Sequence, residues 1–299
     1  MEPEVKLVKL IGVGGDEFHL IGPNAGDRGV WLGTGLEGIY DPPVQVVYEE
    51  PANLPGARYL THRILRRDVV FGVEILNDKG AGNSWLSRDS AWRKAFRYHR
   101  DCQLVVETAE SGTRTLNMKL GQQPEISLHT DPNGNSVNRA IMTCVAGDPF
   151  WYGEEKVYVA KTVTDTTGGG VENLTIDTED EPINPTDQMI WPVWVVHAPA
   201  KWTIPDYSWE DNELANRRLV LPGLTLNEDT VFHTDPRLPP AVSFSGTNVP
   251  GRMGGVRFRH PVPEYTGPGV FNISVTGAPI GSEIHLRLPR PWSRPWGLE

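Results

Sequence analysis

The sequence predicts a mainly β protein, with a single helix in its first half and a two-sheet sandwich in its second half. Three observations lead to this fold class. The 31 glycines and 26 prolines are spread along the chain in clusters, which is typical of turns between short strands. Apolar and polar residues alternate in several segments, as in a strand with one buried face. One stretch has the spacing of an amphipathic helix.

The first half contains the clearest strands. Apolar side chains recur at every second position in two runs: Val69, Phe71, Val73 and Ile75 in one, and Leu116, Met118 and Leu120 in the other. Segments 103–108 and 114–120 flank a short loop with a glycine, which predicts a hairpin. Segments 125–129 and 137–145 flank a run of turn-forming residues, which predicts a second hairpin.

The predicted helix lies within residues 84–99. Its apolar face consists of Trp85, Trp92, Ala95, Phe96 and His99. Ser84 or Ser87 can cap the first turn, because a serine hydroxyl accepts a hydrogen bond from an N–H group that has no partner there. The first half is therefore expected to be a β domain with one helix packed on its sheet.

The second half is expected to be all β. Candidate strands lie at 156–163, 191–197, 217–221, 231–234, 269–276 and 284–288. No helical run separates them, so they predict a two-sheet sandwich or a jelly roll. A chain of 299 residues usually divides into more than one core. We therefore expect two domains, 1–150 and 151–299.

The segment AGDPFWYGEE lies at the expected boundary and has three interpretations: a sugar subsite, an acidic catalytic loop or a structural joint. The joint is favoured because Pro149 can end the last strand of the first domain. Phe150, Trp151 and Tyr152 would then pack the two domains together.

Charge and hydropathy exclude several function classes. The net charge of −10, without a basic block, argues against a nucleic-acid-binding protein, which needs Lys and Arg to neutralise phosphates. The N-terminal MEPEVKLVKL lacks the features of a signal peptide, and no segment is long and apolar enough to span a bilayer. We expect a soluble protein without membrane insertion.

Motifs for catalysis or cofactor binding are missing from the sequence. The two cysteines, Cys102 and Cys144, are expected to be buried thiols. The eight histidines are scattered, without HExxH or a close pair at ligand spacing, although metal sites can assemble from distant residues. No GxSxG motif occurs, and neither glycine-rich run has the Gly-Lys-Ser/Thr of a phosphate loop. We predict no catalytic residue, no cofactor and no metal.

Tryptophan is abundant, with ten in the chain and seven of these from position 151 onward. In a β-sandwich a tryptophan can serve as core, as an interface anchor or as a platform for a sugar ring. Trp202, Trp209, Trp292 and Trp296 lie in proline-rich or charged surroundings, so core and interface roles stay equally open for them.

An ordered set of short motifs resembles the distal tail proteins of bacteriophages with long, non-contractile tails. The motifs are Asp41-Pro42-Pro43, the helix around Trp92, Asp148-Pro149-Phe150-Trp151-Tyr152, Asn184-Pro185-Thr186-Asp187 before Trp191-Pro192, Thr234-Asp235-Pro236-Arg237, and Pro291-Trp292-Ser293-Arg294-Pro295-Trp296-Gly297. Together they extend over the full length of the chain.

The resemblance implies a structural virion component rather than an enzyme, assembled in the host cytoplasm and placed at the distal end of the tail. Its first domain would be a belt akin to the tail-tube fold, a β-sandwich or split barrel with one helix, that closes into a ring, usually of six copies. Its second domain would be a peripheral galectin-like sandwich. The implied partners are further copies of the chain, the major tail tube protein, hub and other tail-associated proteins, and the tape-measure protein. The candidate ring contacts are Trp85, Trp92, Phe96, Asp131 and Asn133, on the helix and the second predicted hairpin.

A rival interpretation is a carbohydrate-binding or receptor-binding tail protein. In that case Trp202, Trp209, Trp292 and Trp296 would stack on sugars of the host surface. A galectin-like fold does not by itself indicate sugar binding, because function resides in sites and not in folds.

Overall fold

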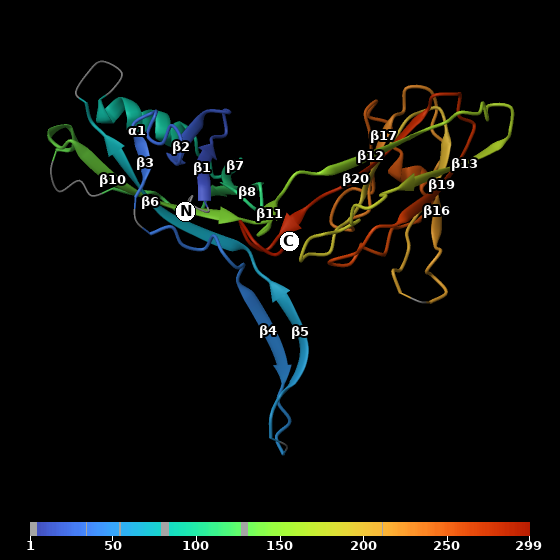
Figure 1. Cartoon of the computed structure of the whole chain (residues 1–299), viewed down its shortest axis with the longest axis horizontal. Coiled ribbons are helices and arrows are strands. Elements are labelled where there is room, and N and C mark those ends of the chain that lie inside the picture. The colour runs from blue at the N-terminus through green and yellow to red at the C-terminus, as the bar shows by residue number, and fades with distance from the viewer. Residues whose placement is uncertain (1–4, 34, 54, 79–83, 127–130, 211) are drawn as a thin grey trace. The chain divides into compact units, whose positions relative to one another are not determined.

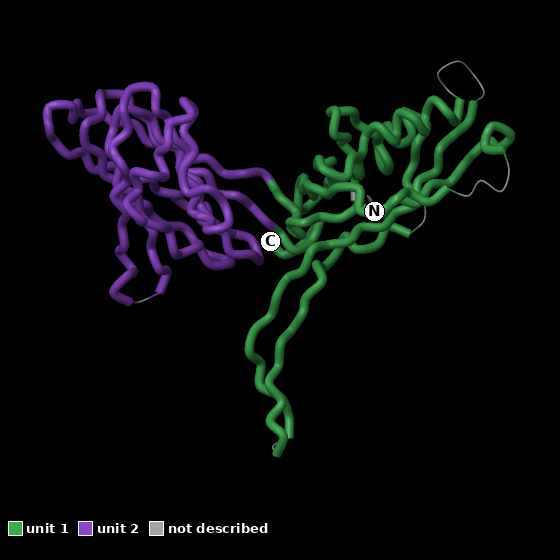
Figure 2. The backbone as a smooth tube through the Cα atoms, turned by 180° about the vertical axis from the view of Figure 1, so that it is seen from behind, with its two compact units in different colours: residues 1–153, 292–299 green, residues 154–291 purple. Residues whose placement is uncertain are grey.

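The computed structural model describes residues 5–33, 35–53, 55–78, 84–126, 131–210 and 212–299. It divides the chain into two compact units (Figure 2): unit 1 is Met1–Gly153 with Trp292–Glu299, and unit 2 is Glu154–Pro291. The last eight residues thus belong to the first unit, whereas we expected all of 151–299 in the second. Burial explains the difference, because Trp292 is 6% exposed and lies in the hydrophobic core of unit 1.

Unit 1 is built on one large antiparallel sheet in the order β2-β1-β7-β8-β10-β6-β3 (Figure 1). The strands of this path are β1 (Val5–Ile11), β2 (Glu17–Ile21), β3 (Val30–Leu32), β6 (Arg67–Leu76), β7 (Cys102–Thr108), β8 (Thr113–Leu120) and β10 (Val137–Ala146). Three short strands attach to it: β9 (Glu125–Ile126) pairs with β10, while β11 (Trp151–Tyr152) pairs with β8 and with β21 (Pro291–Trp292). The turn before β10 contains a short 3-10 helix, η1 (Pro132–Gly134).

Both hairpins predicted in unit 1 are present in the described residues. β7 pairs with β8, with Leu104 opposite Leu116. β9 pairs with β10, and the rest of the predicted segment, 127–130, lies outside the described residues. β10 also pairs with β6 along its whole length. The alternation in β6 directs Phe71 and Val73, both fully buried, into the core.

The predicted helix is α1 (Trp85–Lys94), with Ser84 as its N-cap. Its central residue Trp92 is fully buried and packs edge-on against Phe18 of β2 and Phe71 of β6. The helix ends five residues before the predicted end. The reason is local: the carbonyl of Ala95 accepts from Val13 N–H, in the turn between β1 and β2, at 2.9 Å. His99, placed on the buried face by the sequence pattern, is exposed.

Unit 2 consists of two antiparallel sheets. The first has the order β12-β20-β14-β17-β18, with β12 (Lys156–Lys161), β14 (Val193–Val196), β17 (Thr230–His233), β18 (Ala241–Ser243) and β20 (Glu283–Leu288). The second has the order β13-β19-β15-β16, with β13 (Val171–Asp177), β15 (Lys201–Pro205), β16 (Arg218–Val220) and β19 (Val270–Thr276); a 3-10 helix, η2 (Pro250–Arg252), precedes β19. Trp194 and Leu286 of the first sheet share one core with Trp202 and Ile273 of the second, so the predicted sandwich is confirmed.

Two strands of unit 1 lie outside its large sheet. β4 (Val44–Glu49) and β5 (Arg58–Ile64) form a separate two-stranded hairpin, which extends away from the rest of unit 1 (Figure 1). Among the described residues, the chain contains no helix with the length and apolar character needed to cross a bilayer.

Candidate functional site

Two of the five predicted ring contacts lie in the core of unit 1. Trp92 is fully buried and Phe96 is 3% exposed, and their rings pack against each other at 4.9 Å. A neighbouring subunit cannot reach either side chain. The prediction that they form an interface is therefore wrong. Their spacing in the sequence instead reflects the burial of Trp92, on α1, and of Phe96, just after it, in one core.

The other three predicted ring contacts lie near one another at the surface. Asn77 joins them: its Oδ1 accepts from Trp85 N–H at 3.1 Å, and its Nδ2 donates to the Asn133 carbonyl at 3.0 Å. The Asp131 carboxylate accepts from Asn133 N–H at 2.9 Å and caps η1. Asp131 and Asn133 are exposed and Trp85 is partly buried. The N-terminal end of α1 and η1 thus form one continuous surface.

The aromatic segment at the predicted joint belongs to unit 1. Trp151 is fully buried in the core of that unit, and its Nε1 donates to the Ile39 carbonyl at 2.9 Å. The carbonyl of Pro149 accepts from Arg67, while Phe150 is partly buried. The hydroxyl of Tyr152 donates to Asp148 at 2.6 Å. Trp151 therefore completes the core of unit 1, although the segment does adjoin the boundary at Gly153.

The C-terminal tryptophans also belong to unit 1. Trp292 is nearly fully buried, and the guanidinium carbon of Arg114 lies 3.9 Å from its ring centroid. Arg114 in turn donates to the Arg294 and Gly297 carbonyls and to the Glu299 carboxylate, at 2.7–3.0 Å. Trp296 is partly buried and lies 5.7 Å from the Tyr40 ring.

Two of the four tryptophans to which the rival interpretation assigns sugar stacking lie in unit 2. Trp202 is fully buried, and its Nε1 donates to the His197 carbonyl at 3.0 Å. Trp209 is partly buried and packs edge-on against Tyr207 and Phe271. The burial of Trp202 and Trp292 excludes both from stacking on a ligand, which corrects two of the four residues proposed for that role.

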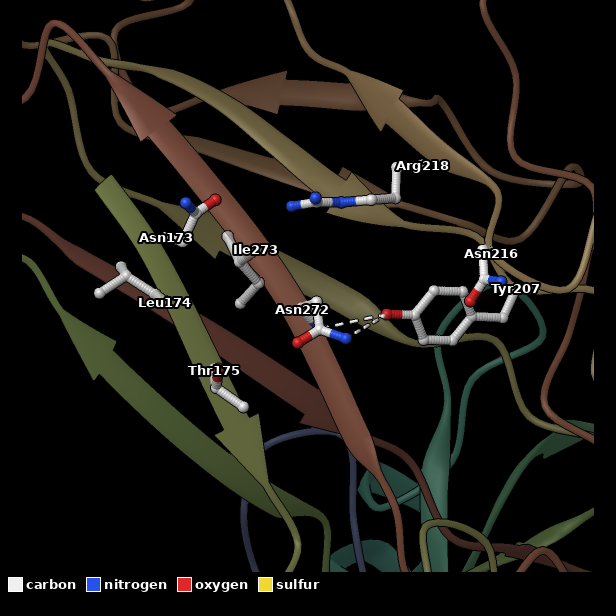
Figure 3. Close-up of a pocket in the computed structure, with 8 residues that line it drawn as sticks. All are labelled: Asn173, Leu174, Thr175, Tyr207, Asn216, Arg218, Asn272 and Ile273. Atoms are coloured by element: carbon white, nitrogen blue, oxygen red, sulfur yellow. Dashed lines mark hydrogen bonds between the residues drawn. The ribbon is translucent and has the colours of Figure 1, made fainter. Parts of the chain in front are cut away.

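An open groove of about 340 Å³ does lie on the outer face of the second sheet of unit 2 (Figure 3). It is lined by Asn173, Leu174, Thr175, Tyr207, Asn216, Arg218, Asn272 and Ile273. The Tyr207 hydroxyl accepts from the backbone N–H of Asn272 at 3.1 Å. The eight lining side chains carry no carboxylate, imidazole or thiol, and the groove presents mainly hydrogen-bonding amide, hydroxyl and guanidinium groups.

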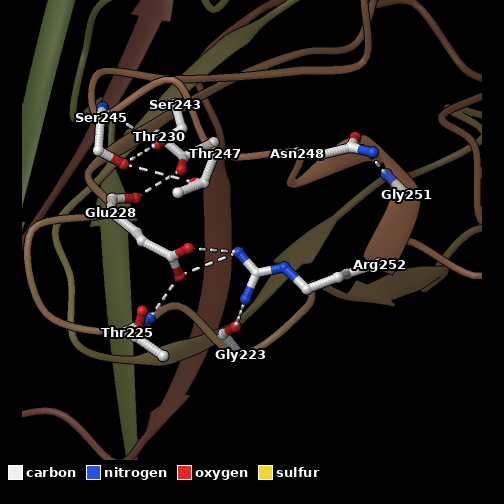
Figure 4. Close-up of polar contacts among 10 residues, drawn as sticks. All are labelled: Gly223, Thr225, Glu228, Thr230, Ser243, Ser245, Thr247, Asn248, Gly251 and Arg252. Atoms are coloured by element: carbon white, nitrogen blue, oxygen red, sulfur yellow. Dashed lines mark hydrogen bonds and ion pairs between the residues drawn. The ribbon is translucent and has the colours of Figure 1, made fainter.

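A second polar cluster holds the loops of unit 2 together (Figure 4). The Glu228 carboxylate accepts from Thr225 N–H at 2.7 Å and from Arg252 Nη2 at 2.9 Å to each oxygen. Arg252 also donates to the Gly223 carbonyl. These donors, the Thr225 N–H first and Arg252 next, lower the Glu228 pKa to about 2. Both terminal nitrogens of the Arg252 guanidinium thus bind groups of the chain, which indicates a structural role for the cluster.

The β4–β5 hairpin carries a group of exposed apolar side chains that the sequence analysis did not identify. Its strand and turn residues expose Val44, Val46, Tyr48, Tyr59, Leu60 and Leu65, each by at least 40%. Tyr48 and Tyr59 pack edge-on at 6.2 Å, and the Tyr59 hydroxyl lies 2.5 Å from His62 Nδ1. The alternating Val44 and Val46 could have signalled a strand. Nothing in the sequence shows that the strand lies outside a core.

The comparison with solved structures defines the fold class of the chain. The chain matches the crystal structure of the phage SPP1 distal tail protein Dit (gp 19.1), with a TM-score of 0.59 over 95% of this chain and 99% of that one, at 11% identity. That protein is described as a paradigm of the hub adsorption apparatus in phages that infect Gram-positive bacteria. The predicted fold class, a mainly β distal-tail fold with one helix, is thereby confirmed.

Sequence comparison identifies the family. No family model matches the chain. The minor tail proteins Gp27 of Mycobacterium phages D29 and L5 are each 46% identical to it over an alignment of 334 positions. The alignment covers 98% of this chain and 98% of the relative. The chain belongs to this family of phage minor tail proteins. It is a structural component of the virion tail, as the resemblance found in the sequence implied.

Proposed function

We propose that this chain forms a ring, with six copies, at the distal end of the phage tail, where it joins the tail tube to the hub of the tail tip. Family membership and the distal-tail fold support the place in the virion. Unit 1 supplies the ring, and unit 2 lies at its periphery. The partners are neighbouring copies, the tail tube protein, the hub proteins and the tape-measure protein within the channel.

One observation carries the assembly part of this proposal: the exposed β4–β5 hairpin. An isolated two-stranded hairpin is at best marginally stable in water, and its outer edges carry unpaired N–H and C=O groups. Each strand of this hairpin pairs only with the other among the described residues, yet the hairpin exposes six large apolar side chains. A surface of this kind is typical of a protein interface.

Ring closure follows from the symmetry of such contacts. When one surface of a subunit binds a different surface of the next, repetition about a rotation axis closes a ring if the angle permits. The hairpin provides one of the two surfaces. The surface formed by α1 and η1, with Trp85, Asp131 and Asn133, provides the other. The net charge of −10 suits a channel that must pass DNA without retaining it.

The oligomeric state of the purified full-length chain tests the proposal. We expect rings by native mass spectrometry, and we expect Tyr48→Ser with Tyr59→Ser to shift the population to monomers. Tyr98→Ser is the matched control, because Tyr98 is 61% exposed in unit 1 but lies outside the hairpin. A chain that stays monomeric at high concentration, even with tube and hub proteins added, contradicts the proposal, as does a hairpin variant that assembles like the control.

A further inference from the structure

Three side chains of metal-binding type meet on the first sheet of unit 2. Ligand atoms of His197, Glu283 and His285 all lie within 4.8 Å of one another, and no other such group occurs in the part of the chain that the structure describes. Our sequence analysis predicted no metal site, because His197 and His285 are 88 positions apart and form no close pair at ligand spacing. An inference from this cluster is independent of the proposed ring.

Strand register explains why the three side chains converge. β14 pairs with β20 so that Val196 lies opposite Ile284, and the next residue, His197, donates its N–H to the Glu283 carbonyl at 3.0 Å. His197 and Glu283 therefore occupy opposite positions on one face of the sheet. His285 lies two residues after Glu283 and points to the same face, because side chains alternate along a strand.

The geometry suits a tetrahedral ion. Donor atoms in a tetrahedral zinc site lie about 3.4 Å apart, given metal–ligand bonds of about 2.0–2.2 Å. Glu283 Oε2 and His285 Nε2 are 2.9 Å apart, and the two imidazole centroids are 5.8 Å apart. All three ligand atoms lie within 4.8 Å of one another, so rotation of the side chains would bring them to the spacing that one ion requires.

The surroundings hold the carboxylate in place and leave the site accessible. Lys161 Nζ contacts Glu283 Oε1 at 2.6 Å, so Oε2 is the oxygen that faces the histidines. A hydrogen bond to the non-ligating atom of a carboxylate orients it as a ligand. The side chains of Glu283 and His285 are 24% and 30% exposed, which leaves room for an ion and a water molecule to enter.

We propose that His197, Glu283 and His285 bind a divalent transition-metal ion of the Zn²⁺ class. The protein supplies two imidazole nitrogens and one carboxylate oxygen, a ligand set that Zn²⁺ accepts, and water occupies the fourth position. The ion links the C-terminal end of β14 to the start of β20. It stabilises unit 2 by binding the folded state and not the unfolded one.

Zinc titration of the full-length protein tests the site. After dialysis against a chelator, Zn²⁺ is added in competition with a chromophoric chelator at pH 7.5. We expect one tight site per chain. His197→Ala and His285→Ala should each weaken it at least tenfold, and Glu283→Gln should weaken it as well. The matched control is His233→Ala, because His233 lies on the same sheet, opposite Val193, outside the cluster.

Two further readouts separate ligation from a folding defect. Zn²⁺ should raise the midpoint of thermal unfolding of the wild type and of His233→Ala, but not that of His197→Ala or His285→Ala. Co²⁺ bound in place of Zn²⁺ should give the visible absorption of a tetrahedral site, which His285→Ala abolishes. Absence of one-to-one binding in the wild type overturns the proposal. So does a histidine variant that keeps wild-type affinity, or a control that loses affinity equally.

Discussion

At the scale of single residues, Arg67 holds more of unit 1 together than any other charged side chain described above. It is fully buried, and its guanidinium donates to the carbonyls of Gly38, Tyr40, Pro149 and Ser293 at 2.7–3.0 Å. Burial lowers its pKa to about 10, an effect that Asp41 partly offsets, so the group stays charged at neutral pH. Three backbone segments distant in sequence, at residues 38–40, 149 and 293, thus depend on one side chain.

Replacing Arg67 should therefore destabilise unit 1 strongly. Arg67→Met leaves four carbonyls without their donor, two of them, those of Pro149 and Ser293, in buried contacts. We therefore expect the free energy of unfolding to fall by about 3–5 kcal/mol. Urea unfolding of the purified protein measures this change in the free energy of unfolding. The neighbour Arg66, whose side chain is 69% exposed, gives the control Arg66→Met, which should change stability by less than about 0.5 kcal/mol. A similar loss in both variants would show that the buried contacts contribute little.

We expect Glu228 to make the stability of unit 2 depend on pH. Its pKa is lowered from 4.5 to about 2 in the folded chain, so its stabilising effect is complete above pH 4.5 and is lost as the pH falls from 4.5 to 2. We expect Glu228→Gln to be less stable than wild type at pH 7, with the difference vanishing near pH 2. Thermal unfolding followed across this range measures it, with the exposed Glu213→Gln as control. A difference that does not change with pH would refute the assignment.

Residue burial was only partly predictable. Cys102 and Cys144 are buried, as their apolar neighbours indicated, and burial raises the pKa of Cys102 to about 12. The burial of Trp202 was harder to predict, because Lys201–Pro205 is a short strand flanked by prolines. Trp202 and Ile204 do, however, alternate with polar residues. The zinc-type cluster was not predictable, because it depends on the register of two strands that are far apart in the sequence.

At the scale of elements, the C-terminal segment has an unexpected place. Trp292–Glu299 returns to unit 1, where β21 pairs with β11 and Arg114 covers the Trp292 ring. The motif of this segment was recognised in the sequence. Its return to the first unit was not, because strand pairing between positions 151 and 292 leaves no local signal.

Two tryptophans of this segment make a matched pair for testing its role. Trp292→Ala removes a nearly fully buried ring from the core of unit 1 and should cost about 3–5 kcal/mol. Trp296→Ala, at a partly buried ring, should cost about 1 kcal/mol. Calorimetric unfolding of the two variants measures both. Equal costs would show that the segment does not depend on the burial of Trp292.

The elements of unit 1 also differ in how well their sequence reveals them. α1 and the β7–β8 hairpin follow from periodicity and turn residues, because the helix and these two strands of the large sheet each turn one apolar face to the same core. The β4–β5 hairpin has comparable alternation but no core to cover. The partner that we propose for it lies outside the chain, and a single sequence carries little information about such a partner.

At the scale of the whole molecule, the chain is a tail protein with two folded units, each with its own core. The division near residue 150 was expected from length and from the change in strand pattern, and the sandwich of unit 2 from strands without intervening helices. We propose that unit 1 closes a ring through its exposed hairpin and that unit 2 lies outside that ring.

A reconstruction of the intact tail tip by cryo-electron microscopy tests this claim most directly. We predict six copies of the chain in one ring directly below the tail tube, with the β4–β5 hairpins buried against neighbouring subunits. A tail in which the chain is absent from that ring, or in which the hairpins stay exposed to solvent, would contradict it.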